Sequence, residues 1–135
     1  MFSGKGLRKR VAEAVGRTLE PGEMVRSTVY LHVYGDASAT ILTGLPVGIR
    51  TWIAVLTDRR VILLKGNELN AANSEMVATY PTADVTVVAG EGEPASGPKH
   101  LDLQIRDHGT LRFAVPLVWR KDAAGFVAGL SGERA

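Results

Sequence analysis

His100, Asp102 and His108 come closest, by residue type and spacing, to a set that could do chemistry. Two imidazoles and a carboxylate can bind a metal ion, and a histidine beside a carboxylate can act as an acid–base pair. His100 and Asp102 are two residues apart in an alternating segment, so their side chains would share one face of a strand. Polar residues also fill exposed strand faces without any functional reason. A hydrolase or metal protein that uses these three residues is therefore the least favoured of our interpretations.

Asp58, Arg59 and Arg60 form a second charged cluster, between two apolar segments. We interpret it as turn chemistry, because aspartate readily forms hydrogen bonds with the backbone of a turn. The chain has no cysteine, which excludes disulfides, thiolate nucleophiles and thiolate metal sites, and which fits a reducing compartment. We therefore expect a protein without enzymatic activity, cofactor or metal, and the residues identify no small-molecule substrate.

The excess positive charge of the chain lies in its first 20 residues. They hold five basic and two acidic side chains, a net charge of +3, whereas the other 115 residues have a net charge of −1. The basic residues nearest the N-terminus are Lys5, Arg8, Lys9 and Arg10. Such a face can be solvated, can lie on anionic lipid or can contact nucleic acid phosphates. We expect no nucleic acid partner, because nothing in the chain would read base edges.

A helix is predicted over this segment, because apolar residues recur on one side of a helical wheel and Pro21-Gly22 ends the pattern. The apolar side holds Leu7, Val11, Ala14 and Val15. An amphipathic helix thus follows the basic start, in place of the apolar run of a signal peptide. Residues 37–56 have the length of a membrane span but contain glycine, proline and arginine, so we predict no transmembrane helix and a cytoplasmic location.

Residues 25–34, 52–57 and 61–65 are predicted strands. The first alternates apolar and polar residues, which indicates one buried face and one wet face. The other two are predicted to form a hairpin with Val55 opposite Ile62, which makes both of its faces apolar. Such a hairpin needs a second cover besides the core. The N-terminal helix is the nearest candidate for this cover, and a partner subunit is the other.

A further hairpin is predicted at residues 101–115, after two shorter strands at residues 77–80 and 84–89. A turn centred on Asp107-His108, with Gly109 in the left-handed conformation, would pair Arg106 with Thr110. This register would place Ile105 opposite Leu111, Leu103 opposite Phe113 and Leu101 opposite Val115.

An amphipathic helix is predicted to close the chain after Pro116. Its apolar side holds Trp119, Ala123, Phe126, Val127 and Leu130. The order of one helix, seven short strands and one helix predicts a mainly β (α+β) fold, a bent sandwich or small barrel. The C-terminal helix would plug its open end with Trp119 and Phe126.

Residues 35–50 connect two predicted strands and yet are rich in apolar side chains, whereas connections are normally polar. Our candidate binding residues in this segment are Leu45, Val47, Ile49 and Arg50. Either the segment folds over the barrel, or a protein or membrane covers it. An apolar loop beside a hairpin with two apolar faces is a surface that a homo-oligomer would bury.

The sequence resembles the bacterial pleckstrin homology (PH-like) family, which is related in fold to PH and GRAM domains. Residues 54–64, Ala-Val-Leu-Thr-Asp-Arg-Arg-Val-Ile-Leu-Leu, are similar to the Leu-Thr-Asp-x-Arg hairpin of that family. The ending is also similar, from Phe113-Ala114-Val115-Pro116 through Trp119 to Phe126-Val127 and Leu130. The resemblance covers residues 22–131, which leaves residues 1–21 as an added basic helix and residues 132–135 as a tail.

The resemblance implies a seven-stranded antiparallel two-sheet barrel with a C-terminal capping helix. It implies no enzymatic activity, no substrate, and self-association or binding at a membrane or protein surface. Eukaryotic members hold phosphoinositides with a Lys/Arg cluster around the first strand pair, whereas residues 35–51 offer only Arg50 here. Inositol phosphate recognition is therefore not expected.

Our first hypothesis is a non-catalytic interaction module that acts through protein contact, as a homo-oligomer or with another protein. The alternative is a peripheral module at the inner membrane face. It would use the basic helix, with Lys5, Arg8, Lys9 and Arg10, together with the apolar loop at residues 41–49, on an anionic membrane surface.

Overall fold

The computed structural model describes residues 4–33, 41–42, 51–66, 75–89, 92–93 and 97–133. Two helices and ten strands lie in these ranges: α1 (Gly4–Gly16), β1 (Val25–Val33), β2 (Ile41–Leu42), β3 (Thr51–Thr57), β4 (Arg60–Lys65), β5 (Met76–Pro81), β6 (Val85–Ala89), β7 (Gly92–Glu93), β8 (Gly97–Pro98), β9 (His100–Ile105), β10 (Gly109–Ala114) and α2 (Arg120–Glu133). Two short 3-10 helices, η3 (Thr82–Asp84) and η4 (Leu117–Trp119), precede β6 and α2.

Some candidate residues of the sequence analysis fall outside this description. They are Leu45, Val47, Ile49 and Arg50, together with the side chains of Lys5 and Arg8, whose backbone belongs to α1.

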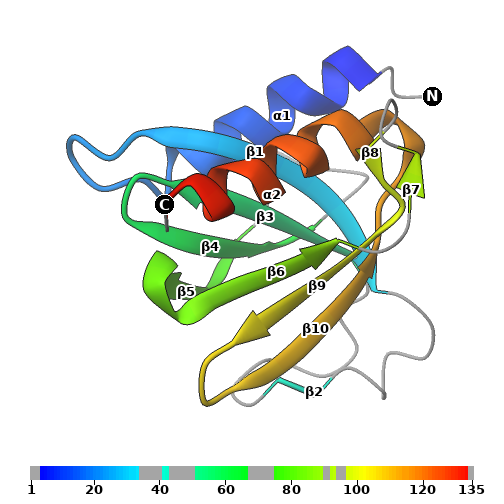
Figure 1. Ribbon diagram of the computed structural model, residues 1–135. Coiled ribbons are helices and arrows are strands. Elements are labelled where there is room, and N and C mark those ends of the chain that lie inside the picture. Colours follow the sequence, from blue (N-terminus) through cyan, green and yellow to red (C-terminus); the bar gives the residue numbers. More distant parts are fainter. Residues whose placement is uncertain are drawn as a thin grey trace.

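Seven strands form one antiparallel sheet in the order β5-β4-β3-β1-β10-β9-β6 (Figure 1). β2 pairs with the start of β10, and β7 pairs with β8 apart from this sheet. The edge strands β5 and β6 follow each other in the chain and are joined by η3. Within the described residues they do not pair with each other, so the sheet is not closed. The predicted mainly β class and the seven antiparallel strands are confirmed.

One face of the sheet forms the interior of the protein. Val33 lies opposite Phe113, which in turn lies opposite Leu101, and directly opposed residues of an antiparallel pair point to the same face. All three side chains are buried. α2 packs against β1 and covers this interior, with Phe126 buried as predicted. Trp119 is also buried, but it belongs to η4 and stacks on Tyr30.

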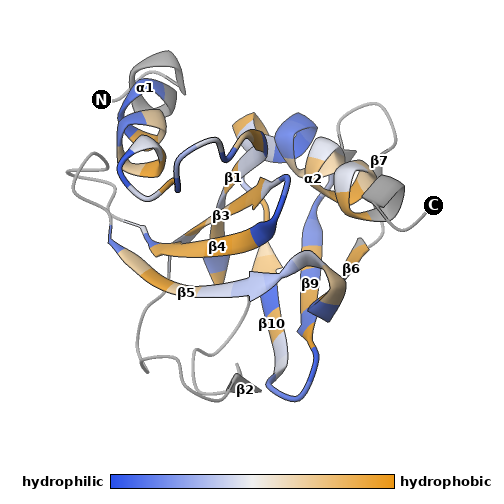
Figure 2. Ribbon diagram, turned by 90° about the vertical axis from the view of Figure 1, so that its left-hand side faces the viewer, coloured by the Kyte–Doolittle hydropathy of each residue, from blue (hydrophilic) through white to orange (hydrophobic). Residues whose placement is uncertain are grey.

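The opposite, outer face of β1, β3 and β4 is buried as well. Val55 lies opposite Ile62, and Ile53 lies opposite Leu64, with all four side chains inaccessible to solvent. α1 contributes three buried side chains to the same cluster, Val11, Ala14 and Val15. Figures 1 and 2 show β3 and β4 between α1 on one side and β9 and β10 on the other. The second cover that this hairpin requires is therefore the N-terminal helix of the same chain.

Tyr30 shows where the predicted wet face of β1 is wrong. Its side chain lies opposite Ile53 on the outer face and is buried. The ring of Trp119 stacks on it, with ring centroids 6.2 Å apart. The alternation of β1 placed Tyr30 on the correct face, but α1 and η4 exclude water from that face.

The two hairpins differ in how well their registers were predicted. β3 and β4 pair as expected, with Val55 opposite Ile62. In β9 and β10, by contrast, Ile105 lies opposite Gly109, two residues from the predicted register. Asp107 takes a left-handed conformation with φ 66°, and the amide of His108 donates to the carbonyl of Ile105, so the turn lies one residue earlier. A shift of two residues keeps every side chain on its face, so the alternation cannot distinguish the two registers.

α1 is amphipathic, as predicted, and ends at Gly16, before Pro21. Lys9, Arg10 and Glu13 are exposed on the side that faces away from the sheet. In the part of the chain that the structure describes, neither helix has the length and apolar character needed to cross a membrane.

Candidate functional site

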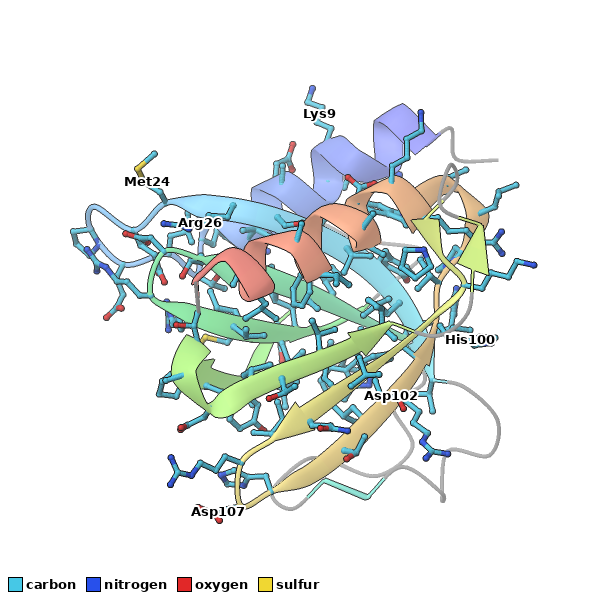
Figure 3. All side chains as sticks on the ribbon, in the orientation of Figure 1. Lys9, Met24, Arg26, His100, Asp102 and Asp107 are labelled. Atoms are coloured by element: carbon cyan, nitrogen blue, oxygen red, sulfur yellow. The ribbon has the colours of Figure 1, made fainter. Side chains whose placement is uncertain are left out.

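The structure does not bring His100, Asp102 and His108 together. Asp102 lies on the outer face of β9 and forms a surface ion pair with Arg112, with Oδ2 3.7 Å from Nε. His108 lies in the turn beyond the other end of β9, and the five steps from His100 to the end of this strand span about 17 Å. Figure 3 shows His100, Asp102 and Asp107 spread along the hairpin. Among the described residues, no three potential ligand side chains are placed to hold a metal ion.

Glu23, which the sequence analysis did not single out, is the centre of a buried polar cluster. Its side chain is 0% exposed and accepts two hydrogen bonds from Arg60, from Nε to Oε2 and from Nη2 to Oε1, each 2.8 Å long. The hydroxyl of Thr57 donates to Oε2 at 2.7 Å, and the amide of Glu20 donates to Oε1 at 2.9 Å. A two-pronged guanidinium–carboxylate pair of this kind fixes both partners in orientation as well as in distance.

The β3–β4 turn uses this cluster to hold the connection between α1 and β1. Arg60 Nη2 also donates to the carbonyl of Thr18 at 3.0 Å. Asp58 bonds both backbone groups of Met24: its amide donates to the carbonyl, and its Oδ1 accepts from the amide, each at 3.0 Å. Within the turn itself, the hydroxyl oxygen of Thr57 accepts from the amides of Arg59 at 3.1 Å and Arg60 at 3.0 Å. The predicted local role of Asp58 is therefore taken by Thr57, and the hydrogen bonds of Asp58 and Arg60 to a segment more than 30 residues away in the chain were not predicted.

One signal in the sequence pointed to this partner. Arg60 lies beside a strand pair that is otherwise apolar, so its buried guanidinium requires a carboxylate. The connection that precedes β1 offers Glu20 and Glu23. The pairing of β1 with β3 brings that connection to the turn, because Val25 lies opposite Thr57.

The cluster has the electrostatics of a structural ion pair. The pKa of Glu23 is lowered from 4.5 to about 2, mainly by the hydrogen bonds from Arg60; burial alone would raise it, and the amide of Glu20 and the hydroxyl of Thr57 lower it further. The same pair raises the pKa of Arg60. A general base has a pKa near the working pH. Glu23 stays ionised far below neutrality, so it is suited to holding structure and not to exchanging protons.

This pKa predicts a specific loss of stability in acid. Because the pKa of Glu23 is lower in the folded protein than in the unfolded chain, its contribution is complete above about pH 4.5 and disappears as the pH falls towards 2. The contribution is on the order of 3 kcal/mol. Urea unfolding at a series of pH values should show this decline in the wild type. The decline should be smaller by that amount in Glu23→Gln; identical pH profiles for the two proteins would contradict it.

Of the four basic residues of α1, the structure describes the side chains of Lys9 and Arg10. Lys9 and Arg10 are exposed, and Figure 3 shows Lys9 pointing away from the body of the protein. The apolar side of α1 is buried against the sheet. α1 therefore offers a charged outer side to any partner, while its apolar side is already used.

Six large apolar side chains are exposed among the described residues: Met24, Val25, Met76, Val88, Leu117 and Val118. Met76 and Val88 lie on the two edge strands, β5 and β6. Leu117 and Val118 are neighbours in η4. These six residues could not be identified from the sequence, because single apolar residues in these positions are indistinguishable there from core residues.

Comparison with models of known protein families gives no match for this chain, and comparison with curated proteins gives none.

Proposed function

We propose that this chain is a non-catalytic PH-like module that acts through contact with another protein. The strand order supports the PH-like part of this proposal. β1, β3, β4 and β5 form a meander of four strands, β6, β9 and β10 form one of three, and the pairing of β1 with β10 joins the two. A helix follows the last strand and covers the interior. This is the arrangement expected of a two-sheet PH-like barrel.

The contact part of the proposal rests on the edge strands. β5 and β6 are the two ends of a sheet that is not closed, and each exposes one large apolar side chain, Met76 at 48% and Val88 at 46%. Sheet edges with exposed apolar side chains are templates for pairing with another chain. The first candidate partner is a second copy, since identical edges can pair around a two-fold axis.

Light scattering on the purified protein tests self-association. We expect an oligomer at tens of micromolar, and at least about a tenfold weaker association in Met76→Glu and Val88→Glu, because a charge at the centre of a contact costs 1 kcal/mol or more. Ala124→Glu, on the exposed side of α2, is the control and should associate like the wild type.

Two outcomes would contradict parts of the proposal, the first the self-association and the second the contact surface. A wild-type protein that remains strictly monomeric would remove self-association and leave only contact with a different protein. An oligomer that is unchanged in both edge variants would exclude β5 and β6 as the contact surface.

The membrane-associated alternative, which combines α1 with the 41–49 loop, has no support from the described residues. Insertion of an amphipathic helix requires a free apolar side, and that of α1 is packed on the sheet. Beyond β2, residues 43–49 of the loop lie outside the described residues.

A further inference from the structure

The corner between β10 and α2 presents two neighbouring aliphatic side chains to solvent. Leu117 is 68% exposed and Val118 is 58% exposed. The turn that carries them is held in place, since the amide of Trp119 donates to the carbonyl of Pro116 at 2.9 Å and the Trp119 side chain is buried. The exposure of the two residues is therefore a fixed property of the fold and not the result of a loose segment.

Basic side chains flank this pair. Lys121, which lies in α2 one turn after Leu117, is exposed. Arg120 is held beside the corner because its Nε donates to the carbonyl of Val115 at 3.4 Å. Lys99, also exposed, is brought to the corner from the other side, because its carbonyl accepts from the amide of Val115 at 2.8 Å. We define the η4 corner as Lys99, Leu117, Val118, Arg120 and Lys121.

The η4 corner adjoins the outer face of β1. Trp119, the last residue of η4, stacks on Tyr30, and Tyr30 belongs to the outer face that α1 covers.

We propose that the η4 corner docks on an anionic lipid surface, with Leu117 and Val118 entering the interfacial region and the surrounding lysines and arginines contacting lipid headgroups. Aliphatic side chains combined with basic ones match the two layers of such a surface, acyl chains and anionic headgroups. A protein partner fits less well, because lysine is depleted at protein interfaces. Two aliphatic residues would also form only a small apolar core for such an interface. The inference goes beyond the proposed protein contact and does not depend on it, since the edge strands are not involved.

Sedimentation with vesicles tests the proposal, with vesicles of phosphatidylcholine alone and of phosphatidylcholine mixed with phosphatidylserine. We expect binding to the anionic vesicles only. The double variant Leu117→Asp/Val118→Asp should weaken it by at least about tenfold, since it removes apolar burial and adds negative charge. Lys99→Glu/Lys121→Glu should weaken it to a similar degree. Both pairs are exposed, so the variants should fold, which thermal unfolding checks.

Matched control variants separate a defined corner from general electrostatic attraction. Met24→Asp changes a residue that is 69% exposed and precedes the start of β1, about 20 Å along the strand from Tyr30. Arg106→Glu reverses an exposed charge at the opposite end of β9 from Lys99. Both controls should bind the anionic vesicles within about twofold of the wild type.

Three outcomes would overturn the proposal. The first is no binding of the wild type to anionic vesicles. The second is equal binding of the Leu117→Asp/Val118→Asp variant, and the third is an equal loss in the control variants. If that double variant fails to change vesicle binding but lowers the oligomeric state measured by light scattering, the corner is a protein contact and the lipid assignment is wrong.

Discussion

Glu23→Gln is expected to lower the free energy of unfolding by about 3 kcal/mol, because it leaves a buried guanidinium without a charged partner. The Arg60 side chain is only 17% exposed, and its two hydrogen bonds to the carboxylate are both 2.8 Å long. Glutamine has nearly the same size as glutamate, so the loss reports charge and hydrogen bonding and not a cavity. Urea unfolding at neutral pH measures it.

Glu20→Gln is the matched control for this variant. The Glu20 carboxylate lies 3.9 Å from Arg59 and 4.0 Å from Arg60 but is 57% exposed. Exposed ion pairs of this length contribute less than about 1 kcal/mol. A loss in Glu23→Gln no larger than that in Glu20→Gln would show that the buried cluster does not hold the α1–β1 connection.

Ala14→Glu is expected to release α1 from the sheet. The Ala14 side chain is 0% exposed, so a glutamate there would bring a carboxylate into an apolar contact. An unpaired buried charge costs several kcal/mol, and detachment of a short terminal helix avoids this cost. Hydrogen exchange of the α1 amides should accelerate on the order of a hundredfold, while β9 and β10 remain protected. The uncovered outer face should bind a hydrophobic dye.

Ala12→Glu is the control, since it adds the same charge to the same helix at an exposed position. It should leave the protection of α1 unchanged. If both variants retain wild-type protection, α1 does not depend on its packing against β3 and β4. If β9 and β10 lose protection together with α1 in Ala14→Glu, the helix is an integral part of the core and not a separable cover.

The hydrogen bonds of the charged hairpin turn give it a structural role. Thr57, Asp58 and Arg60 belong to the segment on which the family resemblance rests, and all three contact residues between Thr18 and Met24. Their contacts orient the N-terminal helix and the start of β1. Within the described residues, the turn therefore serves the fold, and the contact surfaces that we propose lie elsewhere, on the edge strands and at the η4 corner.

The hydrophobic pattern was sufficient to locate the seven strands of the main sheet and their apolar faces, but not the two-residue strands β2, β7 and β8. A period of two is a local property of the backbone, so Val55 and Ile62 could be placed on one face without knowledge of the rest of the chain. The same local reasoning failed for the β9–β10 register, because registers two residues apart satisfy one hydrophobic pattern and the conformation of Asp107 decided between them.

The contacts of each strand face follow from the packing of segments that are distant in the chain. The pairing of Glu23 with Arg60 joins residues 37 positions apart, and no local pattern encodes it. The outer face of the β3–β4 hairpin fitted either a helix or a partner subunit until α1 was found on it. The exposure of Leu117 and Val118 likewise depends on where Trp119 is buried. Burial and partnership are set by the packing of distant segments, and the hydrophobic pattern of one segment constrains that packing only weakly.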